Sequence, residues 1–186
     1  DAFAEELRII NKMCVAIGWP PLFRWSEREL PHEVAFLLRP TARAFNEFVL
    51  ALDKLLSDNI NVAFFPPSIS RKTEKEVAPG RVEVQQRGSL SLLEEWLFSH
   101  FRTDDKKSLE DAISTLKRVR KLRQTRAHSL DEHSFNEALF EEQRNLFLKA
   151  YGAVRLLRLV IQNHPKARPV LEEMDERVVK GQIWPF

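Results

Sequence analysis

The chain has one cysteine, Cys14, and only five glycines among its 186 residues. A lone cysteine excludes a disulfide within the chain and a zinc site built from cysteines, and it is typical of a reducing compartment. The scarcity of glycine argues against a loop-rich β sandwich and against glycine-rich loops that cradle phosphates. Any chemistry must therefore come from other side chains.

Long apolar runs are also absent. The best candidate for a membrane helix, residues 153–161, is interrupted by two arginines and falls short of the ~20 apolar residues needed to span a bilayer. Glu5 and Glu6 break the apolar segment that a signal peptide would need. We therefore expect a soluble, cytoplasmic protein with no membrane partner. Because the chain begins at Asp1 rather than at methionine, we expect an excised domain or a processed product of a longer parent.

The composition is that of a globular protein, with 44% hydrophobic and 30% charged residues, and the length fits one domain over residues 1–186. Apolar residues recur at helical spacing along most of the chain. They predict helices over residues 2–17, 31–38, 41–56, 108–126 and 134–163, one beginning near residue 89 with Ser91 and Glu94 as a capping box, and a short one within 169–179. Short links favour antiparallel neighbours, so we expect an all-α, up-and-down bundle of five or more helices.

Residues 60–88 differ in character from the rest, because they are rich in proline and charge. Segments 68–77 and 81–86 flank Pro79-Gly80, a turn signal, which predicts a β-hairpin or a partly mobile insertion. The single domain then divides into N-terminal helices with the insertion (1–88), core helices (89–163), and a C-terminal helix and tail (164–186).

The net charge of +2 conceals a basic cluster. Six basic residues fall within ten positions, with no acid among them: Lys117, Arg118, Arg120, Lys121, Arg123 and Arg126. One interpretation is a solvated helix face balanced by acids elsewhere. The other is a phosphate-contacting surface, in which Lys117, Arg118, Arg120, Lys121 and Arg126 bind nucleic acid.

Arg123 lies on the apolar stripe of its helix, seven residues after Leu116. A guanidinium in that position needs an acid, a helix end, a partner or a ligand. One explanation is an ion pair with Glu137 or Glu141 of the last long helix. The alternative is that the arginine belongs to a functional site.

His128 follows Arg123 by five residues. We expect the helix to end near Ala127, since polar residues follow and a new helix start is predicted at Ser134, so the imidazole can turn back toward the guanidinium. These two groups suit RNA cleavage, in which the 2′-hydroxyl is the nucleophile and the enzyme supplies a base, a cation and an acid. No metal is required, and two copies related by a two-fold axis would supply acid and base together.

Residues 122–128, Leu-Arg-Gln-Thr-Arg-Ala-His, lie between two long amphipathic helices and resemble the Arg-x4–6-His motif of the HEPN superfamily. The resemblance extends over about residues 89–163. It implies a compact helical bundle that dimerises to form a composite, metal-independent ribonuclease site. By position, Arg123 and His128 would be the catalytic pair and Gln124 a supporting polar residue, where the family more often has Asn, Asp or His.

The same resemblance implies RNA as substrate, a homodimer, and a toxin or antiphage role held in check by an antitoxin or by a regulatory domain of a larger parent chain. The main alternative is a non-catalytic HEPN-like module for dimerisation or for binding a partner, a nucleotide or nucleic acid. In that case Lys117, Arg118 and Lys121 would matter more than His128.

A third possibility, an enzyme of another class within residues 1–88, lacks any catalytic constellation. The remaining histidines show no metal-ligand spacing, so we predict neither a metal site nor a cofactor. They are His32, His100, His133 and His164.

Overall fold

The computed structural model describes residues 2–25, 40–126 and 135–181, without the side chain of Arg126. These residues are mostly helical with one two-stranded antiparallel sheet, as the sequence predicts. The helices are α1 (Ala2–Ile17), α3 (Ala42–Leu55), α4 (Ser89–His100), α5 (Lys106–Arg126), α6 (Ala138–Gln162) and the short α7 (Glu176–Val179), with 3-10 turns at Val62–Phe64 and Arg168–Glu173. No helix in these ranges is both long and apolar enough to cross a membrane.

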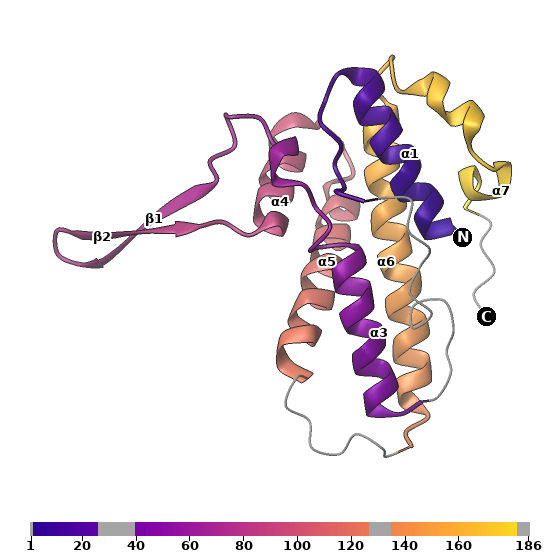
Figure 1. The fold of residues 1–186 in the computed structure, drawn as a ribbon, viewed down its shortest axis with the longest axis horizontal. Helices are drawn as coiled ribbons and strands as arrows, with labels where there is room; N and C mark the ends of the chain where they lie inside the picture. The colour runs from indigo at the N-terminus through magenta and orange to yellow at the C-terminus, as the bar shows by residue number, and fades with distance from the viewer. Residues whose placement is uncertain (1, 26–39, 127–134, 182–186) are drawn as a thin grey trace.

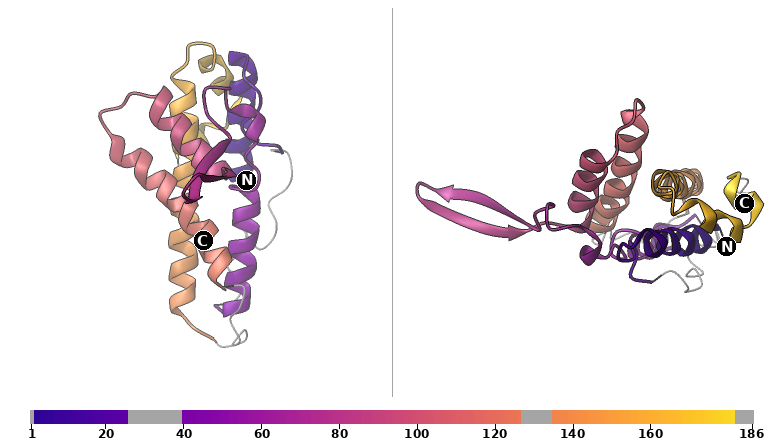
Figure 2. Two further views of the ribbon diagram at one scale, coloured as in Figure 1. Left: turned by 90° about the vertical axis from the view of Figure 1, so that its left-hand side faces the viewer. Right: turned by 90° about the horizontal axis from the view of Figure 1, so that it is seen from above.

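Three long helices, α3, α5 and α6, lie side by side (Figure 1). α5 runs antiparallel to both of its neighbours and packs against each of them, while α1 packs on α6. Seen from above, α1 and α3 lie on one side of α5 and α6 (Figure 2). The expected antiparallel arrangement is therefore present among these long helices.

The core forms where the predicted apolar stripes meet. Phe3, Phe45, Leu116 and Val154 are all buried, and they come from α1, α3, α5 and α6 in that order. Burying one such side chain contributes about 1.5–3 kcal/mol. The aromatic connection after α1 packs into the same interior, with Trp19 edge-on to neighbouring rings. Its aromatic rings are therefore part of the packing.

One predicted helix start is confirmed, and another is wrong by two residues. α4 begins at Ser89, as predicted, but the capping box of Ser91 and Glu94 is wrong, because the N-cap is Gly88, which makes no side-chain hydrogen bond. The Ser89 hydroxyl instead donates to the carbonyl of Ser57 at 2.8 Å. α5 begins two residues before 108, because the Asp105 carboxylate accepts the amide of Ser108 at 3.1 Å.

The remaining helix boundaries agree with the sequence to different degrees. Thr41 is the N-cap of α3, and its hydroxyl accepts the amide of Ala44 at 3.2 Å. The last long helix starts four residues later than predicted, and Phe135 pairs with Thr41 as an isolated bridge before it. The predicted helix over 31–38 lies outside the described residues.

The insertion contains the predicted hairpin. β1 (Lys72–Ala78) pairs antiparallel with β2 (Arg81–Gln86) around a turn in which Gly80 has φ +74°, a conformation that favours glycine. β2 has the predicted bounds, while β1 begins later than residue 68. Every residue of both strands is exposed, and the hairpin projects away from the helices (Figures 1 and 2).

Candidate functional site

Arg123 lies one turn before the described end of α5 and is 34% exposed. It has acidic partners, as one sequence interpretation required, but the predicted partners Glu137 and Glu141 are wrong. Arg123 Nη1 donates to Oδ2 of Asp53 at 2.7 Å and to Oδ2 of Asp58 at 2.6 Å. The reason is tertiary: the end of α3, rather than the start of α6, lies beside this turn of α5.

Arg120 binds the same two carboxylates from the preceding turn of α5. Its Nε donates to Oδ1 of Asp53 at 2.9 Å, and its Nη2 donates to Oδ1 of Asp58 at 2.6 Å. Asp53, Asp58, Arg120 and Arg123 therefore form a closed group of two carboxylates and two guanidinium groups, which we call the Asp–Arg cluster. Its formal charges sum to zero.

The two acids of the Asp–Arg cluster differ in burial. Asp53 is fully buried on the last turn of α3, whereas the side chain of Asp58 is 40% exposed. Burial alone would raise the pKa of Asp58, but hydrogen bonds and charge from Arg123 and Arg120 lower it below its ordinary value. The hydrogen bonds to Asp53 and Asp58 raise the pKa of Arg123. A buried carboxylate needs such partners, so the cluster ties α3 to α5.

Two other basic residues of α5 are balanced by acids on neighbouring helices. Lys117 Nζ donates to both carboxylate oxygens of Glu94 on α4, at 2.8 and 2.7 Å. Arg118 lies 3.5 Å from the carboxylate of Glu142 on α6. All four side chains are partly exposed, so these pairs are weak. The interpretation of a solvated, balanced face fits these two residues.

The remaining predicted site residues are either exposed or outside the described part of the chain. Lys121 is exposed and forms no ion pair within the described ranges, and Gln124 is also exposed. The side chain of Arg126 and all of residues 127–134, including the proposed catalytic His128, lie outside the described residues. The structure therefore places the arginine of the proposed catalytic pair and leaves its geometry with His128 unspecified.

Sequence reasoning missed both acids of the Asp–Arg cluster. Asp53 follows Val49 by four residues and Leu52 by one, so it lies beside the apolar stripe of α3. A carboxylate at that position is a signal of a buried ion pair. Nothing in the local sequence of Asp58 indicates its role.

A second missed pair joins α1 to α6. Arg158, which interrupts the apolar run in the sequence, is fully buried, and its Nε donates to Oε2 of the buried Glu6 at 2.6 Å. Burial raises the pKa of Glu6, while Arg158 opposes that shift. The hydroxyl of Tyr151 donates to Glu6 Oε1 at 3.3 Å, and burial together with the Glu6 charge raises the tyrosine pKa to about 12.

Comparisons with protein-family models, curated proteins and solved structures find no match to this chain. Within the part of the chain that the structure describes, no three His, Cys, Asp or Glu side chains are grouped to hold a metal ion. Function is therefore argued from the residues of the site.

Proposed function

We propose that this chain is a HEPN-like, metal-independent endoribonuclease that cleaves RNA as a homodimer through a composite site. The supporting observation is the orientation of Arg123. Its Nη1 is held by Asp53 and Asp58, while its Nε and Nη2 donate to no residue in the described ranges. The side chain is one-third exposed and lies five residues before His128, so we propose that its remaining N–H groups donate to the RNA phosphate that His128 acts on.

The chemistry follows from the groups that each copy supplies. The 2′-hydroxyl attacks the adjacent phosphorus, and the imidazole of one His128 takes its proton. The phosphorane carries extra negative charge, which Arg123 stabilises through charge-assisted hydrogen bonds. The imidazolium of the second copy protonates the leaving 5′-oxygen. The products are a 2′,3′-cyclic phosphate and a 5′-hydroxyl, and Gln124 supplies a further polar group beside the reacting phosphate.

The basic residues of α5 would hold the substrate. Lys121 has no ion pair in the described ranges, and Lys117 and Arg118 have only partly exposed acidic partners, so their charge can be redirected to phosphates. As part of the proposal, the protein acts in the cytoplasm as a toxin or antiphage effector. An antitoxin or a regulatory domain of a longer parent chain restrains it.

A second candidate, a non-catalytic HEPN-like binding module, is favoured by one observation. The Asp–Arg cluster is electrically balanced and joins α3 to α5, so Arg123 already has a structural role without any substrate. Such a module would bind RNA or a nucleotide through α5 with strong salt dependence and no turnover.

Metal-free RNA cleavage distinguishes the two candidates. Wild-type protein, His128→Ala and the control His100→Ala, an exposed histidine at the end of α4, are incubated with RNA in EDTA. The ribonuclease proposal expects cyclic-phosphate products, a loss of about 10²-fold or more in His128→Ala, and no change in the control. Equal rates in all three proteins would overturn it. Salt-sensitive RNA binding without cleavage by a folded wild-type dimer would favour the binding module.

A further inference from the structure

The two faces of the projecting hairpin differ in chemistry. The strand register places Glu74 opposite Val84 and Glu76 opposite Val82. Residues directly opposite in an antiparallel pair share a face, so these four side chains lie together and form what we call the acidic face. Val82 and Val84 are 54% and 55% exposed. Lys72, opposite Gln86, lies on the same face nearer the base of the hairpin. The outer part of this face therefore offers two apolar side chains, each beside a carboxylate.

The base of the hairpin is firmly attached to α4. The backbone amide of Arg87 donates to the carbonyl of Arg71 at 2.9 Å. The Arg87 guanidinium donates to the carbonyl of Ser70 at 2.9 Å and to the hydroxyl of Ser91 at 3.0 Å, and it pairs with Glu95. This attachment directs the strands away from the bundle (Figures 1 and 2). An isolated two-stranded hairpin is marginally stable in water, so a surface that covers it would stabilise it.

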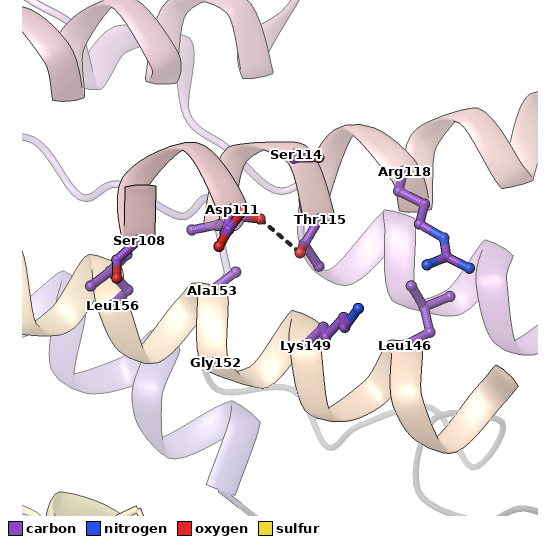
Figure 3. Close-up of a pocket in the computed structure, with 11 residues that line it drawn as sticks. Ser108, Asp111, Ser114, Thr115, Arg118, Leu146, Lys149, Gly152, Ala153 and Leu156 are labelled. Atoms are coloured by element: carbon purple, nitrogen blue, oxygen red, sulfur yellow. Dashed lines mark hydrogen bonds between the residues drawn. The ribbon is translucent and has the colours of Figure 1, made fainter. Parts of the chain in front are cut away.

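A groove of about 500 Å³ lies between α5 and α6, open to solvent (Figure 3). Its lining includes Arg118 from α5 and Lys149 from α6, the half-buried Leu156 and the buried Leu146, and the carboxylate of Asp111 lies nearer the Ser108 end. Gly152 adds space, because no atom lies within 4 Å of the position a Cβ would take. Lys149 forms no ion pair within the described ranges, and the contact of Arg118 with Glu142 is long, at 3.5 Å. The groove thus combines Lys149 and the weakly paired Arg118 with a small apolar area, mainly that of the half-buried Leu156.

We propose that the acidic face docks into the α5–α6 groove of a second copy of this chain. Glu74 and Glu76 would meet Arg118 and Lys149, and the two valines would cover the apolar part of the groove. The lengths are compatible: seven residues of β1 span about 23 Å, and the groove from Ser108 to Arg118 spans about 15 Å along α5. The hairpin points away from the helices of its own chain, so the groove that it meets belongs to another molecule. This contact does not depend on the ribonuclease proposal, but it uses Arg118, which would then be unavailable to RNA and leave the phosphates to Lys117 and Lys121.

Charge reversal on both surfaces tests the contact. One variant carries Glu74→Lys and Glu76→Lys, and the other carries Arg118→Glu and Lys149→Glu. Each variant alone opposes like charges, so each is expected to raise the dimer dissociation constant about tenfold or more. A mixture of the two restores opposite charges at both contacts of a reciprocal dimer. It is therefore expected to form a heterodimer with nearly wild-type affinity in analytical ultracentrifugation.

The control exchanges charges on the opposite face of the hairpin. Lys75 and Glu83 are paired across the strands, so Lys75→Glu with Glu83→Lys preserves their attraction while reversing both charges. It is expected to leave the dimer unchanged. The proposal is overturned if wild-type protein stays monomeric across the micromolar range, or if each charge-reversal variant alone still dimerises like wild type. It is also overturned if the mixture of the two variants fails to form the heterodimer, or if the control variant dissociates as much as they do.

Discussion

Replacing Asp53 by Asn should reveal what the Asp–Arg cluster contributes to stability. The amide is close in size to the carboxylate and keeps one acceptor oxygen, but it removes the charge that faces both guanidinium groups. Asp53 is fully buried, whereas Asp58 is 40% exposed while accepting from the same two arginines. The pair Asp53→Asn and Asp58→Asn therefore compares buried and exposed members of one network.

The expected magnitudes follow from burial. A hydrogen bond to a charged group contributes about 1.5–3 kcal/mol. Breaking a fully buried ion pair costs about 3–5 kcal/mol, because a charge is left without compensation. In the Asp53→Asn variant, Arg120 and Arg123 would still pair with Asp58, and both are about one-third exposed to water. Both facts reduce the cost of losing the Asp53 charge. We expect Asp53→Asn to lower the free energy of unfolding by about 2–3 kcal/mol, and Asp58→Asn by less than about 1 kcal/mol.

Urea unfolding followed by circular dichroism measures both variants. A loss of 2–3 kcal/mol corresponds to a decrease of roughly 4–12 °C in melting temperature for a domain of this size. The denaturant slope should stay constant, since the folded surface is unchanged. Equal losses in the two variants, or an unchanged Asp53→Asn, would refute the reasoning that burial sets the contribution of each carboxylate.

Three further outcomes follow from the same structure. Glu6→Ala leaves Arg158 buried without its partner and should lower the free energy of unfolding by about 3–5 kcal/mol in urea titrations, whereas Glu94→Ala in an exposed pair should change it little. The pKa of Asp58 is lowered in the folded state, so its contribution is complete above the ordinary value of 3.8. The stability difference between wild type and Asp58→Asn should therefore shrink as the pH falls below that value. Burial raises the pKa of the Cys14 thiol to about 12, so a thiol reagent should modify it only at the rate of unfolding, and fast labelling of the native protein would contradict its burial.

Much of the fold was predictable because it depends on local periodicity. The apolar spacing in residues 2–17 and 41–56 led to helices within one residue of the observed bounds, and the alternation after Pro79-Gly80 located β2. The start of α5 at Lys106 was missed by two residues, since it depends on the hydrogen bond that Asp105 accepts from the amide of Ser108, which no apolar pattern encodes.

The sequence by itself determined that Arg123 lies on the inner side of a basic helix and therefore needs a partner, because helical periodicity fixes which side chains share a face. Only the tertiary structure decided which acids those partners are. Asp53 and Asp58 lie more than 60 residues away in the chain, and the packing of α3 against α5 brings them within 3 Å of Arg120 and Arg123. The same holds for Glu6 and Arg158, since contacts between distant segments depend on how the helices pack rather than on the local pattern of either one.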